Sequence, residues 1–226
     1  MNLARQTMNR PAFALAYERA WRPTSFFAAT GRTMQADRRD AARTLRLRDA
    51  RTVLDVACGP GNFTRYLNRH SAADGAAIGI DFSVPMLRRA RADNSGPHVG
   101  YVRGDARRLP FPDGSFDAVC CFGALYLIPE PIVATREMIR VLAPGGRIAI
   151  STSHRAEGWF GRVSGLVGGA GGLRVFDPDT FPDLFAEAGL TEVEQQVHGL
   201  MQYVAATRPD RSVERRTGYA NTVHHK

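Results

Sequence analysis

The chain has 226 residues, a length that accommodates one α/β domain with a full hydrophobic core but not two. Hydrophobic residues make up 44% and charged residues 23%, as in ordinary globular proteins. No apolar run approaches the roughly 18 residues that a membrane-spanning helix needs, and the N-terminus has no signal-peptide pattern. We therefore expect a cytoplasmic protein without a transmembrane segment.

The net charge of +8 invites a nucleic-acid partner, because a positive field attracts phosphate. The arginines, however, are spread along the whole chain, and the single lysine is Lys226. This distribution favours a general arginine bias over a binding patch, so we expect a small-molecule substrate rather than nucleic acid. The three cysteines are Cys58, Cys120 and Cys121, and their spacing is not that of metal ligands. We therefore predict reduced thiols and no metal site. Monomer and homodimer both stay open.

Residues 1–48 are predicted to be helical. Apolar residues recur there at helical spacing, at Phe13, Ala14, Tyr17, Ala20 and Trp21, and residues 34–47 form an amphipathic second run. From Arg51 onward short apolar strands alternate with helices, a pattern typical of βαβ units with parallel strands. Strands are predicted over residues 52–57, 76–80, 99–103, 116–122 and 147–152, a helix over 177–189, and a closing hairpin over 190–197 and 201–206.

Two segments lack a regular pattern. Residues 155–174 are too rich in glycine for a helix or strand and too apolar for an ordinary solvated loop, so we expect a mobile insert. Residues 208–226 are polar, basic and unpatterned, and we expect a disordered tail.

The most informative stretch is VLDVACGPGNF, in which a buried strand carries Asp55 and a tight turn follows between Gly59 and Gly61. A side chain at either glycine would keep a ligand away from the backbone N–H groups at the start of the next helix. A dinucleotide site would need a glycine where Thr64 stands, and Asp55 would repel a pyrophosphate. S-adenosylmethionine carries an ammonium and a sulfonium cation, so the negative charge of Asp55 favours this ligand over a dinucleotide. The turn taken alone is equally consistent with a plain loop.

Two further acids follow the next two predicted strands. Asp81 stands about twenty residues beyond the glycine turn, the spacing at which an acid meets a ribose diol. Asp105 could accept from an adenine amino group while Ala106 packs near the ring. Asp81 could instead cap a helix that starts near Ser83. Acids at three successive strand ends favour a shared cofactor site.

The segments VLDVACGPG, IGIDFS, GDARRLPFPDGSFDAV and VLAPGGRIAI together resemble the successive motifs of class I S-adenosylmethionine-dependent methyltransferases. The resemblance is greatest to the group that includes the ubiquinone and menaquinone biosynthesis methyltransferases, and it covers about residues 50–155. It implies a Rossmann-like α/β fold: a seven-stranded, mostly parallel sheet with helices on both faces and a reversed last strand. Residues 49–207 would form this core, and the helical residues 1–48 a lid.

The resemblance also implies roles for single residues. It places Asp55 near the methionyl amine, Asp81 on the ribose and Asp105 on the adenine amine. The other cofactor contacts that we predict come from the turn, the neighbouring strand ends and the lid: Tyr17, Ala57, Gly59, Gly61, Phe82, Ala106 and Phe122, the last with Gly123 beside the methionyl part.

Methyl transfer is an in-line displacement, for which the protein must align two partners in a dry pocket. We expect a small, largely apolar acceptor (a quinol, lipid, glycoside or secondary metabolite) methylated on oxygen. A hydroxyl acceptor must lose its proton, and His154, just beyond the fifth strand, is the candidate base. Alternatively, His154 is a structural loop residue that packs on Trp159. Trp21, Tyr126 and Trp159 are candidate substrate contacts that could equally be helix or lid core.

Two other functions compete with this one. Methyltransferases that act on base amines carry an Asn/Asp-Pro-Pro-aromatic turn after the fourth strand, where this chain has CCFGAL. Cytosine C5 enzymes use a cysteine nucleophile, but the proline that usually precedes it is missing before Cys120 and Cys121. A non-catalytic protein that binds S-adenosylmethionine stays open as the second alternative.

Overall fold

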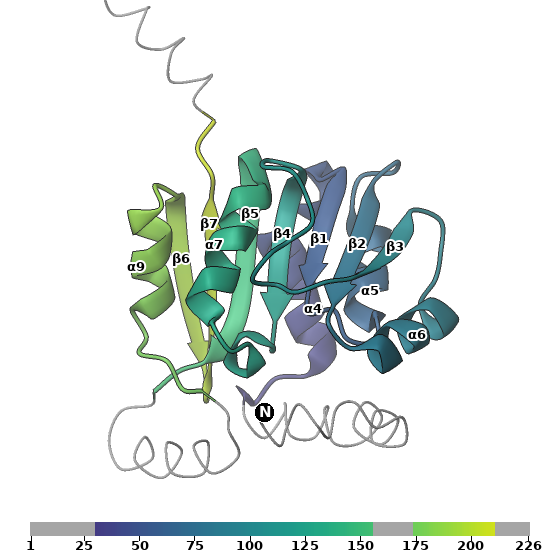
Figure 1. The fold of residues 1–226 in the computed structure, drawn as a ribbon. Coiled ribbons are helices and arrows are strands. Elements are labelled where there is room, and N and C mark those ends of the chain that lie inside the picture. The colour runs from purple at the N-terminus through teal and green to yellow at the C-terminus, as the bar shows by residue number, and fades with distance from the viewer. Residues whose placement is uncertain (1–29, 156–173, 211–226) are drawn as a thin grey trace, which may run out of the picture.

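The computed structural model describes residues 30–155 and 174–210. At its centre lies a seven-stranded sheet with the strand order β3-β2-β1-β4-β5-β7-β6 (Figure 1). The strands are β1 (Thr52–Val56), β2 (Ala76–Asp81), β3 (Val99–Arg103), β4 (Phe116–Phe122), β5 (Leu142–Ser153), β6 (Thr191–His198) and β7 (Met201–Thr207). Strands β1 to β5 are parallel, and β7 runs antiparallel between β5 and β6. The predicted Rossmann-like sheet with a reversed last strand is confirmed.

Helices cover both faces of this sheet. They are α4 (Met34–Thr44), α5 (Asn62–His70), α6 (Val84–Asp93), α7 (Pro131–Val141) and α9 (Thr180–Glu187), with short 3-10 turns η2 (Leu47–Asp49) and η3 (Leu125–Leu127). Helices α7 and α9 pack on one face, while α4 and α5 lie on the other (Figure 1). Since both faces are covered, the central strands are continuous apolar runs, and Val53, Leu54 and Val56 are fully buried.

Several predicted elements differ in extent from the observed ones, and two of the differences have a clear physical reason. The helix expected over residues 34–47 ends at Thr44, because Arg46 adopts a left-handed conformation with φ of 51°. The strand expected from Arg147 begins at Leu142, because Leu142 already pairs with Phe116. The register then shifts before Arg147 pairs with Ala118, so the glycines between them form an irregularity within the strand.

The segment that precedes β1 is part of the core. Leu45 and Leu47 are each 1% exposed and pack with Val53 and Leu67. The nearly buried guanidinium of Arg147 donates to the carbonyl oxygen of Thr44 at 2.6 Å, which fixes the end of α4 to the sheet. The boundary that we predicted at residue 48 therefore falls inside packed structure, and residues 1–29 lie outside the described part of the chain.

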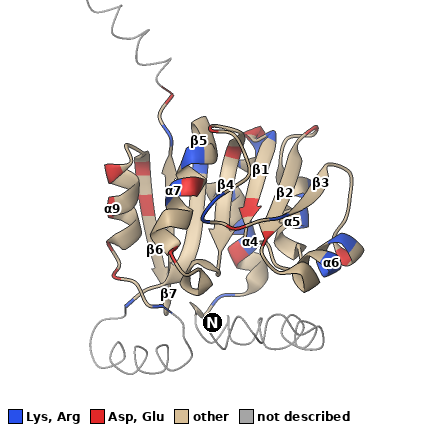
Figure 2. Ribbon diagram, in the orientation of Figure 1, with Lys and Arg blue, Asp and Glu red and all other residues tan. Residues whose placement is uncertain are grey.

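Charged residues are interspersed over the molecule. Figure 2 shows basic and acidic residues on many of the same elements. Several arginines are paired with acids, as in the contacts Arg89–Asp93, Arg147–Glu194 and Arg155–Asp177. Across residues 30–155 and 174–210, none of the helices has the length and apolar character to cross a membrane.

Candidate cofactor and acceptor site

The ends of β1, β2 and β3 meet at the carboxyl edge of the sheet. The N–H of Cys58 donates to the carbonyl of Ile80, and the N–H of Gly104 donates to the carbonyl of Asp81, each at 3.1 Å. The N–H of Gly59 donates to Oδ2 of the Asp81 side chain at 2.8 Å. Backbone contacts thus bring the glycine turn, the second acid and the loop of the third acid to one place.

Glycine is required at positions 59 and 61 for different physical reasons. Gly59 and Gly61 both have positive φ, +55° and +78°, which favours glycine. A Cβ on Gly59 would meet nothing within 4 Å, so open space lies above it. A Cβ on Gly61 would collide with the ring of Tyr101. Ala57 also has a positive φ, 58°, and a left-handed alanine is a strained residue of the kind that clusters at functional sites.

Tyr101 and Asn94 support the turn from behind, and the sequence did not single them out. The Tyr101 hydroxyl lies 2.9 Å from the carbonyl oxygen of Asn94 and 3.3 Å from that of Gly61. The Asn94 amide donates to the carbonyl of Pro60 at 2.7 Å. Alternation along β3 could have pointed to Tyr101, because this residue lies on the buried side of an edge strand.

Asp55 is 2% exposed and lies beneath the turn. The hydroxyl of Thr64, itself fully buried in α5, donates to Oδ2 of Asp55 at 2.6 Å. The residue that replaces the third glycine of a dinucleotide motif therefore ties the helix to the acid of β1. The Sγ of Cys120 is 3.9 Å from Oδ1 of the same carboxylate.

The thiols near Asp55 are held protonated. Burial raises the pKa of Cys58, Cys120 and Cys121 well above the usual range, and the Asp55 carboxylate raises all three further. A protonated, fully buried thiol is a poor nucleophile. This environment disfavours the cysteine-nucleophile alternative of the cytosine enzymes.

Asp81 accepts hydrogen bonds from two backbone N–H groups. Its Oδ1 accepts from the N–H of Ser83 at 2.7 Å, a turn that precedes α6, while Oδ2 accepts from Gly59. Burial raises the pKa of Asp81, and the backbone N–H donors oppose that effect. A carboxylate has about four acceptor positions, so these contacts leave capacity for a ribose hydroxyl.

Asp105 is engaged by a neighbouring guanidinium. Arg107 donates through Nη2 to Oδ2 of Asp105 at 2.7 Å and through Nη1 to Oε2 of Glu130 at 2.5 Å. These side chains are between 34% and 58% exposed, so the pairs lie at the surface of the site. An adenine amino group at Asp105 would share the carboxylate with Arg107.

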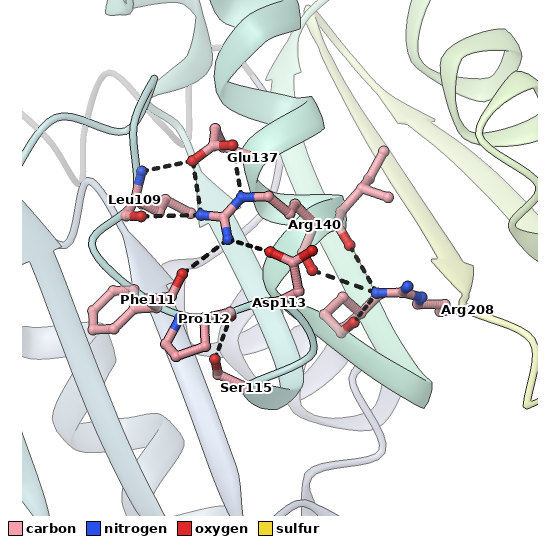
Figure 3. A network of polar contacts seen from close by, with 10 residues as sticks. Leu109, Phe111, Pro112, Asp113, Ser115, Glu137, Arg140 and Arg208 are labelled. Atoms are coloured by element: carbon pink, nitrogen blue, oxygen red, sulfur yellow. Dashed lines mark hydrogen bonds and ion pairs between the residues drawn. The ribbon is translucent and has the colours of Figure 1, made fainter.

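Side chains of α7 bind the backbone of the loop that follows Asp105 and hold it in place (Figure 3). Arg140 donates to the carbonyl oxygens of Leu109 and Phe111, at 3.0 and 2.9 Å. The same guanidinium pairs with Glu137, whose Oε2 also accepts from the N–H of Leu109 at 2.8 Å. Loop and helix therefore form one polar network, and the β3–β4 connection is held without a regular element of its own.

Phe122 ends β4 beside this edge. Its ring packs edge-to-face on Phe63, with centroids 5.1 Å apart. The N–H of the following residue, Gly123, lies 3.0 Å from Oγ of Ser151, and the Tyr126 hydroxyl lies 3.8 Å from the Cβ position of that glycine. Phe82, the residue after Asp81, is 54% exposed, while Ala106 packs partly buried against the core.

His154 is buried where β5 ends. Its Nδ1 lies 3.0 Å from the carbonyl oxygen of Arg155, and its Nε2 lies 3.0 Å from that of Gly199. Both ring nitrogens thus face backbone acceptors, which favours a structural link between β5 and the β6–β7 turn. A base role requires the ring to leave one of these carbonyls. Three predicted residues, Tyr17, Trp21 and Trp159, lie outside the described residues.

Comparison with known proteins places this geometry among methyltransferases. The family described as "Methyltransferase domain" matches residues 54–150. The "Demethylmenaquinone methyltransferase" of Lactococcus lactis is 34% identical over 173 residues, which cover 66% of this chain and 69% of that protein. Its counterpart in Listeria welshimeri is 36% identical over 127 residues, and the chain spans only 54% of that relative.

A solved structure shares the fold. The SAM-dependent methyltransferase of Aquifex aeolicus superposes with a TM-score of 0.64 at 19% identity, covering 88% of this chain and 98% of that one. At this identity the likeness concerns the arrangement of the elements alone.

Proposed function

The chain belongs to the class I S-adenosylmethionine-dependent methyltransferases, and on this premise we propose that it methylates a small hydroxylated aromatic acceptor of the quinone type. The observation that carries the proposal is the contact between Gly59 N and Asp81 Oδ2 at 2.8 Å, which unites turn and acid. The acceptor class rests on the relatives named demethylmenaquinone methyltransferase.

The residues present fit the cofactor. When bound, S-adenosylmethionine supplies a methyl group on a sulfonium, which leaves as a neutral thioether. Gly59 would lie beneath it, because the space at its Cβ position is open. Asp81 would accept from the ribose hydroxyls, and Asp105 from the adenine amine. Asp55 would add negative charge beneath the cationic end, although its Oδ2 is already bonded to Thr64.

The acceptor side lies past the end of β4. Phe122 and Tyr126 would flank the acceptor, orient its ring and exclude water. We propose oxygen as the attacking atom, because a phenolic hydroxyl becomes nucleophilic once it has lost its proton to bulk solvent, before the acceptor is bound. Positioning of this kind can contribute roughly 7–11 kcal/mol to lowering the barrier. The cytoplasm is the proposed location.

A methyl-transfer assay tests this proposal. The purified chain is incubated with S-adenosylmethionine carrying a carbon-13 methyl group and with 1,4-dihydroxynaphthalene, a fatty acid or a glycoside. We expect a labelled product only from the aromatic acceptor, and the carbon-13 shift identifies an O-methyl group. Asp81→Ala, which weakens the cofactor site, serves as the low-activity control. Cofactor binding without any methylated product would instead favour the non-catalytic alternative.

A further inference from the structure

A pocket lies between α4 and the strands β4, β5, β7 and β6, on the face opposite α7. Its walls include Phe122, Ala149 and Val204 from the sheet and Ala41 from α4. Phe122 is also the residue that ends β4 beside the proposed cofactor site. Phe122 therefore belongs both to the wall of this pocket and to the carboxyl edge of the sheet.

Strand register puts the pocket at the reactive edge of the sheet. Phe122 pairs with Ser151, Ser151 pairs with Tyr203, and Tyr203 pairs with Gln196. Directly paired residues point to the same face of a sheet. Tyr203 therefore lies on the same face as Phe122, two strands away, in the row where β4 ends.

The far side of the pocket is polar. Arg32, Asp37, His198 and Tyr203 meet there, and Nη1 of Arg32 lies 3.2 Å from Nε2 of His198. Arg32 also pairs with Asp40. The hydroxyl of Tyr203 interacts with the Asp37 carboxylate, and the buried Nε of Arg32 has no hydrogen-bond partner among residues 30–155 and 174–210. A buried polar atom without a partner is costly, and a ligand atom is one way to satisfy it.

The protonation states suit recognition of a hydroxyl. Burial raises the pKa of the Tyr203 phenol, and the Asp37 carboxylate raises it further, so Tyr203 stays a neutral donor. Burial likewise raises the pKa of Asp37, against the effects of Tyr203 and Arg32. One donor and one acceptor thus stand side by side, opposite the apolar wall.

We infer that this pocket binds the hydroxyl of the aromatic acceptor that is not methylated, with Tyr203 donating to its oxygen and Asp37 accepting its hydrogen. This inference rests on the proposed function and adds the residues that orient the acceptor. Tyr203 and Asp37 are positioning residues in this account. The aromatic body of the acceptor lies along Phe122, toward the end of β4.

The end of the pocket is preorganised. Arg147 holds the carbonyl of Thr44 at 2.6 Å and also pairs with Glu194, another residue of the pocket wall. Helix α4 therefore keeps its place on the sheet without a ligand. A preformed pocket binds without first ordering its own side chains.

Binding of 1-naphthol to the full chain loaded with S-adenosylhomocysteine tests the inference. Tyr203→Phe keeps the ring and removes only the hydroxyl, and we expect about tenfold weaker binding by calorimetry. Asp37→Asn should weaken binding similarly. Tyr66→Phe, a matched change on α5 outside the pocket, should leave it unchanged. The KM for 1,4-dihydroxynaphthalene should rise in both pocket variants while the affinity for S-adenosylhomocysteine stays constant.

The possible results separate the two proposals. If the wild type binds 1-naphthol and methylates 1,4-dihydroxynaphthalene but both pocket variants match it, the pocket assignment is overturned and the proposed function stands. If the wild type binds neither probe, the proposed aromatic acceptor class is wrong, and the pocket assignment is overturned with it. A rise in KM confined to the pocket variants supports both.

Discussion

The two sides of the site are built differently. At the ends of β1 and β2, backbone groups hold the functional acid, since the N–H groups of Gly59 and Ser83 donate to Asp81. In the pocket beneath α4, side chains from distant segments meet, and Arg32 and His198 are 166 positions apart. The proposed cofactor side therefore depends on local backbone shape, while the proposed acceptor side depends on tertiary packing. Mutations should affect the two sides through different observables.

The largest effect is expected at the glycine turn. Gly61→Ala should lower the free energy of unfolding by about 2–4 kcal/mol, because left-handed strain adds to overpacking against Tyr101. Gly59→Ala has the same kind of strain but open space, and should cost only about 1–2 kcal/mol. Denaturant unfolding of both variants measures the difference. Equal losses would show that contact with Tyr101 is not what requires glycine at position 61.

The next effect concerns the ribose acid. Asp81→Ala should weaken S-adenosylhomocysteine binding at least tenfold, about 1.4 kcal/mol, because the ligand loses its carboxylate partner. Asp93→Ala on α6, which removes only a pair with Arg89, is the matched control. Calorimetry on both variants checks the expectation. An unchanged affinity in Asp81→Ala would remove the ribose assignment.

The pH dependence of cofactor binding should be weaker but diagnostic. Burial raises the pKa of Asp81 above its ordinary value of 3.8, and the charged form is the better acceptor. Affinity for S-adenosylhomocysteine should therefore be full above the raised pKa and fall as the pH decreases through it. The fall should begin at a higher pH than an unperturbed aspartate gives. Asp81→Asn should abolish this dependence; its persistence in that variant would assign it to another group.

The smallest effect is expected at His154, on the acceptor side. His154→Gln keeps an N–H that can donate to the carbonyl of Gly199, so turnover should fall by no more than about threefold if the ring is structural. Loss of a general base would instead cost about 100-fold or more. Steady-state turnover at saturating cofactor separates the two roles. Melting of His154→Ala, expected to be less stable than the glutamine variant, is the control for the structural link.

The sequence predicted the cofactor half of the fold well, because its signals are local. Apolar runs gave the parallel strands, and the glycines and acids marked the strand ends. The turn after Val56 needs glycine for backbone reasons, and the closely spaced glycines of the segment CGPG indicate it directly. Even so, the contacts of Gly61 with Tyr101 and of Asp55 with Thr64 depend on strand and helix packing, so the sequence did not give them.

The acceptor half could not be predicted in the same way. The sequence pattern indicates only that Asp37 belongs to an amphipathic helix and Tyr203 to an apolar strand. Their meeting depends on where α4 docks and on the reversed direction of β7. Nothing in the local spacing of either residue carries that information. The pair becomes visible only when the sheet order is known.

The shielding of Cys58 has a chemical consequence for a protein that handles an alkylating agent. A thiolate is a strong nucleophile, and one placed within the glycine turn could become alkylated itself, which would end the protein's activity. Burial and the carboxylates of Asp55 and Asp81 keep this sulfur in its unreactive form. The same acids that favour a cationic ligand thereby protect the chain from self-modification.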